Sequence, residues 1–172
     1  MTFSLTVDST KFRSHLVSVM NNYAAAGAEL VPVIKGNGYG FGRRILAQEA
    51  SRLGCNRIAI GTVWELGQTL ADFSGEILVL EPFNAADESA VAQWRDHLEH
   101  NAARIIVTVS NVDLAAVRSA GAKNIYLEGK TSLSRFGILH HDMQSITSFN
   151  DLNVLGLTLH LPIVQPASKV DA

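Results

Sequence analysis

The chain has 172 residues, of which 47% are hydrophobic, and its 14 basic and 16 acidic side chains leave a net charge of −2. This composition excludes intrinsic disorder, and the absence of a basic block excludes a nucleic-acid-binding surface. A single cysteine, no signal-peptide pattern and no apolar run near the ~20 residues of a membrane span lead us to expect one cytoplasmic domain over residues 1–172, without membrane contact.

Short apolar runs alternate with helical patterns along the chain. A half-buried strand is predicted at Phe3–Val7, followed by a helix that Ser9 caps and that runs to about Ala26. Further helices are predicted at 41–53, 63–72, 86–99, 111–120 and 141–148, with Trp64 and Trp94 as packing residues. They alternate with six predicted strands, namely Val31–Lys35, Arg57–Gly61, Glu76–Leu80, Arg104–Thr108, Asn124–Glu128 and Val154–His160.

This alternation predicts an α/β fold with a parallel sheet. A doubly wound sheet of about six strands fits the chain length, whereas a complete (β/α)₈ barrel needs eight strands and ~250 residues. Successive strands are spaced by about 20 to 30 residues, which is the rhythm of a TIM-type barrel. We therefore predict a partial barrel with about six of its eight strands, and keep the doubly wound sheet as the alternative.

The predicted strand Val31–Lys35 ends in a lysine, and glycines follow at alternate positions from 36 to 42. Ligands of parallel α/β folds gather at the carboxyl ends of strands, where a desolvated lysine can form an imine with a carbonyl compound. The glycines could let backbone N–H groups hold a phosphate. Phe41 breaks the dinucleotide fingerprint and no Walker lysine follows, so nucleotide binding is disfavoured. The plain alternative is a Gly-rich turn beside a solvated lysine.

This stretch also resembles a known motif. Residues 33–42, VIKGNGYGFG, are similar to the pyridoxal-phosphate motif of the alanine racemases, V-V-K-A-N-A-Y-G-H-G, with departures at Gly36, Gly38 and Phe41. The resemblance implies that Lys35 carries pyridoxal 5'-phosphate as a Schiff base and is one of two catalytic bases. It also implies that Tyr39 contacts the cofactor's phosphate.

Two later segments continue the resemblance. Residues 127–137, LEGKTSLSRFG, look like the family's L-K-V-D-T-G-M-x-R-L-G, and residues 156–160, GLTLH, look like its G-x-x-T-H. The match implies that Arg135 binds the cofactor's phenolic oxygen and the substrate carboxylate, a role that suits a planar, permanently charged guanidinium. It implies that His160 stacks on the cofactor ring and that Leu80 packs beside it. Glu128 stands where some members carry a carbamylated lysine, and could orient Arg135.

The resemblance implies an amino-acid racemase that acts on alanine or a similar amino acid and forms a homodimer. It covers nearly all of this chain but only about the first half of a family member, without the phosphate-binding turns, the tyrosine that is the second base or the C-terminal β domain. We therefore expect a chain that is inactive alone, and that self-associates or awaits a missing half.

The alternatives are a non-enzymatic pyridoxal-phosphate-binding or interaction module, and a sugar-phosphate or nucleotide binder. No metal site is predicted, since His97 and His100 read as part of a solvated helix face.

Overall fold

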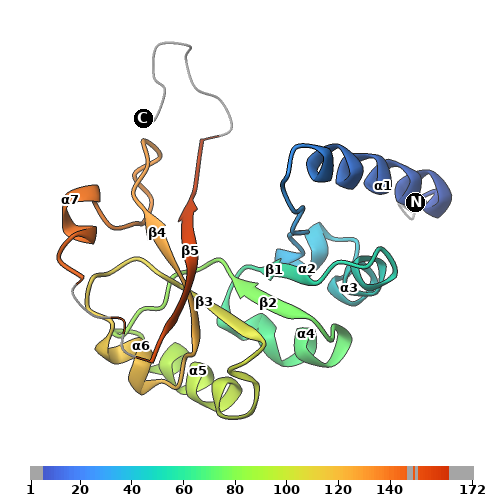
Figure 1. The fold of residues 1–172 in the computed structure, drawn as a ribbon. Coiled ribbons are helices and arrows are strands. Elements are labelled where there is room, and N and C mark those ends of the chain that lie inside the picture. The colour runs from blue at the N-terminus through green and yellow to red at the C-terminus, as the bar shows by residue number, and fades with distance from the viewer. Residues whose placement is uncertain (1–5, 147–148, 150, 163–172) are drawn as a thin grey trace, which may run out of the picture.

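The computed structural model describes residues 6–146, 149 and 151–162. Five strands form the centre of the fold, and helices precede and separate them (Figure 1). The strands are β1 (Arg57–Ile60), β2 (Glu76–Val79), β3 (Ile105–Val109), β4 (Asn124–Gly129) and β5 (Asn153–Leu159). The helices are α1 (Ser9–Ala25), α2 (Lys35–Tyr39), α3 (Arg43–Arg52), α4 (Leu66–Asp72), α5 (Glu88–Asn101), α6 (Ala115–Ser119) and α7 (His140–Met143), with a 3₁₀ turn η1 (Val63–Glu65) before α4.

All five strands are parallel and lie in the sheet in chain order, β1-β2-β3-β4-β5. This confirms the predicted α/β fold with a parallel sheet, and each of these strands lies within one residue of its predicted bounds. A doubly wound sheet reverses its strand order at one point. Because the order of the described strands never reverses, the doubly wound alternative is wrong.

The predicted strand Val31–Lys35 is wrong in its extent. Its only ladder contact is an isolated parallel bridge between Val33 and Ala59, in which the Ile34 N–H donates to the carbonyl of Ala59 and the Ala59 N–H to the carbonyl of Pro32. Pro32 has no N–H to give, and the backbone turns at Lys35 into α2. The segment is therefore an extended arm held by two hydrogen bonds.

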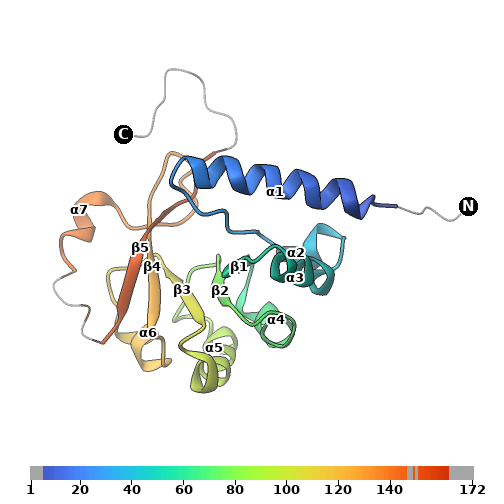
Figure 2. The ribbon, with the colours of Figure 1, turned by 45° about the vertical axis from the view of Figure 1, so that its right-hand side comes forward.

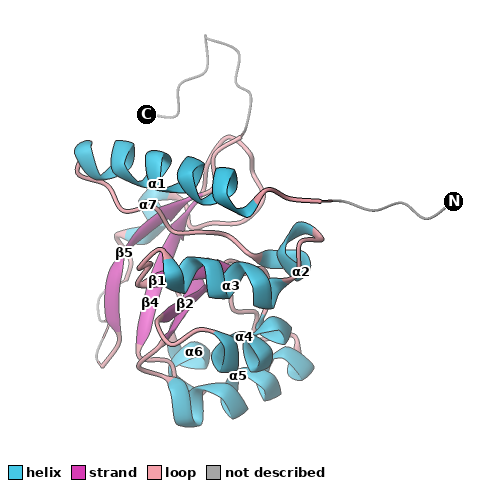
Figure 3. Ribbon diagram, turned by 90° about the vertical axis from the view of Figure 1, so that its right-hand side faces the viewer, coloured by secondary structure: helices cyan, strands magenta, loops and turns pink. Residues whose placement is uncertain are grey.

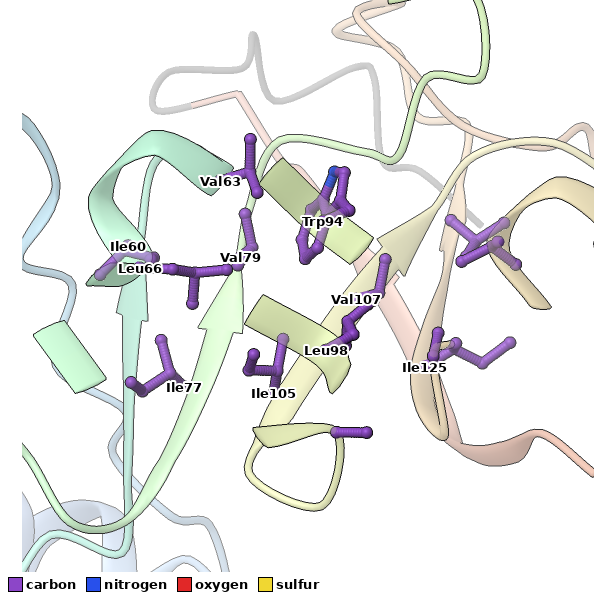
Figure 4. Close-up of a cluster of buried hydrophobic side chains, with 14 of the residues drawn as sticks. Ile60, Val63, Leu66, Ile77, Val79, Trp94, Leu98, Ile105, Val107 and Ile125 are labelled. Atoms are coloured by element: carbon purple, nitrogen blue, oxygen red, sulfur yellow. The ribbon is translucent and has the colours of Figure 1, made fainter. Parts of the chain in front are cut away.

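The main core lies between the sheet and the helices that follow its strands (Figure 2). Side chains of alternate strand residues, such as Ile77, Val79 and Ile105, face Trp94 and Leu98 of α5, and all of them are buried (Figure 4). Trp64 was predicted to pack as well but is 57% exposed, so that prediction is wrong. The helical layer thus holds one face of the sheet and leaves the carboxyl ends of the strands free.

The opposite face of the sheet carries a much smaller cluster. Ala59, Leu78 and Ile106 are buried there, and partly buried apolar side chains such as Leu80 and Tyr126 pack against them. With only three buried apolar side chains among the described residues, this face is shallowly filled, and it leads up to the site described below. On the helical face, at the β5 edge, Leu157 and Leu159 are 61% and 60% exposed.

Helix α1 lies apart from the other helices (Figure 3) and contains no buried residue. The prediction that Ser9 caps this helix is wrong by one residue. Ser9 is its first residue and Asp8 caps it, with a carboxylate that accepts hydrogen bonds from the N–H groups of Thr10 and Lys11. Arg13 ties it to α3 by donating to both carboxylate oxygens of Glu49, at 2.6 and 2.8 Å. These hydrogen bonds, with a further one from Arg52, lower the pKa of Glu49 to about 2 although burial acts against them.

Other predicted elements differ in length or fall outside the description. The helix predicted at 111–120 is the short α6, and that at 141–148 is the single turn α7, with residues 147 and 148 outside the described residues. Most of the predicted strand Phe3–Val7 also lies outside them. None of the helices in the described part of the chain is long and apolar enough to cross a membrane.

Candidate functional site

A pocket of about 400 Å³ opens at the carboxyl ends of the strands. It is lined by all five residues that the sequence singled out, which are Lys35, Tyr39, Leu80, Arg135 and His160. The arm and α2 bring the first two, Leu80 follows β2, Arg135 follows β4, and His160 follows β5. Because the strands are parallel, their carboxyl ends meet at one edge, and residues up to 125 positions apart in sequence therefore share a single cavity.

A left-handed turn carries the chain from Lys35 to α3. Gly36, Asn37, Gly38 and Tyr39 have φ values of 60°, 53°, 64° and 54°. Glycine takes this conformation without steric cost, whereas side chains with a Cβ rarely do. At Gly38 there is also no room, since an added Cβ would lie 2.9 Å from Leu46 Cδ1 and 3.2 Å from the backbone nitrogen of Arg43. The alternate glycines thus build the turn that follows the lysine.

The glycine amides do not form the phosphate cradle that the sequence suggested. The N–H groups of Gly38, Gly40, Phe41 and Gly42 donate to backbone carbonyls within the turn and its flanks, and that of Gly36 donates to a carboxylate. These donors are therefore already used, and that expectation is wrong. The glycines shape the backbone beside Lys35 rather than bind an anion.

Glu65 is a residue of the pocket that the sequence reasoning missed. Its Oε1 accepts hydrogen bonds from the Gly36 N–H and from Arg43 Nη1, both at 3.0 Å, and its Oε2 accepts from the N–H groups of Gly61 and Thr62 at 2.6 and 3.1 Å. A single carboxylate thus joins the turn after Lys35 to the end of β1 and to α3. The sequence did contain a signal, because Thr62-Val-Trp-Glu65 is a capping box at the start of a helix.

The opposite side of the site contains a second carboxylate in a different setting. Glu128 at the end of β4 is only 4% exposed and lines an adjoining pocket of about 330 Å³, which shares Lys35, Tyr39, Leu80 and His160 with the first. Burial raises the pKa of Glu128, and the positive charge of Arg135 opposes that rise in part. The Arg135 guanidinium itself lies 4.9 Å from the ring centroid of Phe136. Glu128 and Arg135 thus interact through their charges, and the orienting role that the resemblance implies for Glu128 stays a prediction.

The arrangement suits one class of ligand. A lysine amine can bond covalently to an aldehyde, a guanidinium and a phenol can hold anionic oxygens, and Leu80 offers an apolar contact for a ring. The residues present therefore fit pyridoxal 5'-phosphate. The described residues contain no group of three or more His, Cys, Asp or Glu side chains that could hold a metal ion.

Comparison with known proteins gives a family match over almost the entire chain. The family model "Alanine racemase, N-terminal domain" matches residues 7–171. No match was found among curated protein sequences.

Solved structures share the fold. Alanine racemase from Clostridium difficile 630, in complex with cycloserine, superposes with a TM-score of 0.68 at 16% identity, covering 92% of this chain and 46% of that one. The alanine racemase of a D-cycloserine-producing Streptomyces lavendulae gives 0.66 at 24% identity, with coverages of 87% and 40%. D-threonine aldolase from Filomicrobium marinum gives 0.70 at 17% identity, with coverages of 91% and 43%. The chain thus spans less than half the length of the enzymes it matches, and at these identities the likeness establishes the fold alone.

Proposed function

Because the chain belongs to the alanine racemase N-terminal domain family, we propose that it provides the lysine-bearing part of a pyridoxal-phosphate-dependent amino-acid racemase. The observation that carries this proposal is the single pocket in which Lys35, Tyr39, Arg135, His160 and Leu80 meet. The sheet is then the first part of a TIM-type (β/α)₈ barrel, in which active sites lie at the carboxyl ends of the strands. Residues 1–172 would form one domain of it.

In this proposal each residue has a distinct task. Lys35 bonds to the cofactor and moves a proton at Cα of the amino acid, which requires its amine to be neutral when it acts. Tyr39 binds the cofactor's phosphate, Arg135 binds the phenolic oxygen and the substrate carboxylate, and His160 and Leu80 contact the ring. The cofactor, when bound, supplies an electron sink for the carbanion.

Glu65 acts as a positioning residue in this scheme. Its hydrogen bonds from Gly36 and Gly61 hold the backbone next to Lys35 against the end of β1. The lysine side chain is thereby presented from a backbone with little freedom, which favours a reproducible angle of approach.

Borohydride reduction tests the proposal directly. Pyridoxal phosphate is added to the purified chain, the complex is reduced, and the labelled peptide is identified by mass spectrometry. We expect label on Lys35 and none on the other lysines, and we expect Lys35→Ala to remove it while Lys130→Ala leaves it intact. Unchanged labelling of Lys35→Ala would show that Lys35 is not the cofactor lysine.

We also propose that the chain associates with itself, with no racemisation by the chain alone. Support comes from the β5 edge, where exposed leucines stand beside backbone groups without a neighbouring strand among the described residues. Sedimentation across a range of concentrations should give a mass above that of one chain. A monomer that interconverts alanine enantiomers would contradict both statements.

A further inference from the structure

The adjoining pocket of about 330 Å³ contains two polar side chains, Glu128 and Thr158, to which the proposed function assigns no contact with cofactor or substrate. Glu128 on β4 and Thr158 on β5 are partners in the parallel ladder, so their side chains lie next to each other on the same face of the sheet. Both line the pocket that Lys35, Tyr39 and His160 also line. The two residues therefore form one polar spot on the wall of the site.

One oxygen of each side chain lacks a partner among the described residues. Glu128 Oε2 and Thr158 Oγ1 are buried, and no hydrogen-bond partner from that part of the chain approaches either atom. Buried polar atoms in native proteins nearly always have a partner. A partner from outside the chain would complete the pair, and the pocket gives it access.

Thr108 provides an internal comparison. It lines the same pocket from β3, but its hydroxyl donates to the carbonyl of Val79 at 2.6 Å. The other neighbours on this wall, such as Val33, Leu80 and Leu159, are apolar. Among the described residues that line this pocket, the buried side-chain atoms without a hydrogen-bond partner are thus Glu128 Oε2 and Thr158 Oγ1.

We propose that Glu128 and Thr158 form a subsite that recognises the side-chain hydroxyl of the amino-acid substrate, so that the substrate class is a hydroxy amino acid such as serine rather than alanine. This rests on the proposed function, because Lys35 must hold the reacting carbon in the same pocket. A hydroxyl both donates and accepts, and it therefore satisfies a carboxyl and a threonine together. Alanine would leave both atoms unpaired.

The electrostatics of the pocket favour a neutral partner over a cationic one. Burial raises the pKa of Glu128, which favours the neutral carboxyl form, and such a carboxyl can itself donate a hydrogen bond. The charged and titratable groups that face the pair from the surrounding elements are Lys35, Tyr39, Arg135 and His160. Lysine and arginine next to the subsite disfavour a substrate with a cationic side chain.

Equilibrium binding tests the subsite without any measurement of turnover. The full 172-residue chain is loaded with pyridoxal phosphate, and its absorbance is followed as L-serine, D-serine, L-alanine or D-alanine is added. We expect serine to bind about tenfold more tightly than alanine, a typical size for one recognised hydroxyl. Thr158→Val should reduce this ratio to about one, whereas Thr158→Ser should keep it.

Two further variants show whether the preference for serine depends on hydrogen bonding rather than on the charge of Glu128 or on the stability of the fold. Glu128→Gln keeps a donor and an acceptor and should preserve the preference for serine, while Thr108→Val should lower stability and leave the preference unchanged. A wild-type chain that binds alanine as tightly as serine, or a Thr158→Val change that weakens both ligands equally, would overturn the subsite. If borohydride fixes cofactor to Lys35 in that same preparation, the proposed function still stands; if no cofactor is fixed, the proposed function falls and the subsite with it.

Discussion

Two adjoining pockets of the site each contain a carboxylate, and the two carboxylates have opposite surroundings. Beside Lys35, Glu65 accepts hydrogen bonds from three backbone N–H groups and one guanidinium. On the β4–β5 side, Glu128 has one buried oxygen that finds no partner among the described residues, and the neighbouring Thr158 hydroxyl finds none there either. The difference indicates a division of labour, in which the protein fixes the geometry of the lysine with its own groups and leaves polar capacity open where a ligand would lie.

The largest effect should come from removing Glu65. Glu65→Ala takes away four hydrogen bonds and leaves Arg43, whose side chain is 15% exposed, without its ion-pair partner. We expect a loss of roughly 3 kcal/mol in the free energy of unfolding, measured by urea denaturation, together with weaker labelling of Lys35. Glu81→Ala is the matched control, since Glu81 is an exposed carboxylate on the same pocket and should cost less than about 0.5 kcal/mol.

The left-handed turn offers a finer test of the Lys35 side. Gly38→Ala combines an unfavourable φ of 64° with a clash against Leu46, so we expect it to cost about 2–3 kcal/mol. Gly36→Ala has a similar φ of 60° but open space around the new Cβ, and it should cost only about 1 kcal/mol. Equal losses in thermal or urea unfolding would show that the contact with Leu46 does not matter.

Lowering the pH should weaken the attachment of α1 to α3. The pKa of Glu49 is lowered from 4.5 to about 2 by its hydrogen bonds with Arg13 and Arg52, so its stabilising effect is complete above the unfolded-state value and is lost as pH falls toward 2. Between pH 5 and pH 2 we expect stability to decline, with α1 detaching from α3. Glu49→Gln should flatten that part of the profile in circular dichroism, and an unchanged slope would place the acid sensitivity elsewhere.

The smallest expected effect on stability comes from Glu128, whose contribution depends on pH in the opposite direction to that of Glu49. Burial raises the pKa of Glu128 above its value in the unfolded chain, so the folded state holds the proton of this carboxyl more tightly. The stability of the fold therefore falls as the pH rises from the unfolded-state pKa of Glu128 to its folded-state pKa. Glu128→Gln removes the cost of a buried charge and should therefore leave stability unchanged or slightly increased at pH 7, by less than about 1 kcal/mol. A marked loss would mean that Glu128, like Glu65, is satisfied within the protein, and the comparison would fail.

The pattern of apolar residues was enough to predict the five strands of the sheet, but it wrongly predicted a further strand at Val31–Lys35. The apolar run Ile105–Val109 is buried on both faces and forms a strand, whereas Val31–Lys35 is also rich in β-branched residues but makes only one bridge. The difference comes from partners: β3 has a strand on each side, while the arm has β1 alone and a proline in its middle. The β-propensity of a segment does not indicate how many neighbouring strands it will pair with.

The site shows a similar limit. Lys35 and Arg135 could be picked out because their neighbours form motifs, and His160 because it ends a strand. Glu65 could not be assigned a role, since its capping box predicts only a helix start, and its bonds to Gly36 and Arg43 join residues more than twenty positions away. Likewise, the use of the glycine amides within their own turn depends on φ values that the letters do not specify.

The strict chain order of the strands also bears on how the molecule forms. Each strand pairs with the one that precedes it, so every new pairing closes only a short stretch of chain. Short closures are entropically inexpensive and correlate with rapid folding. The sheet can therefore grow by one strand at a time as the chain leaves the ribosome, and at each stage the last strand added offers the template for the next.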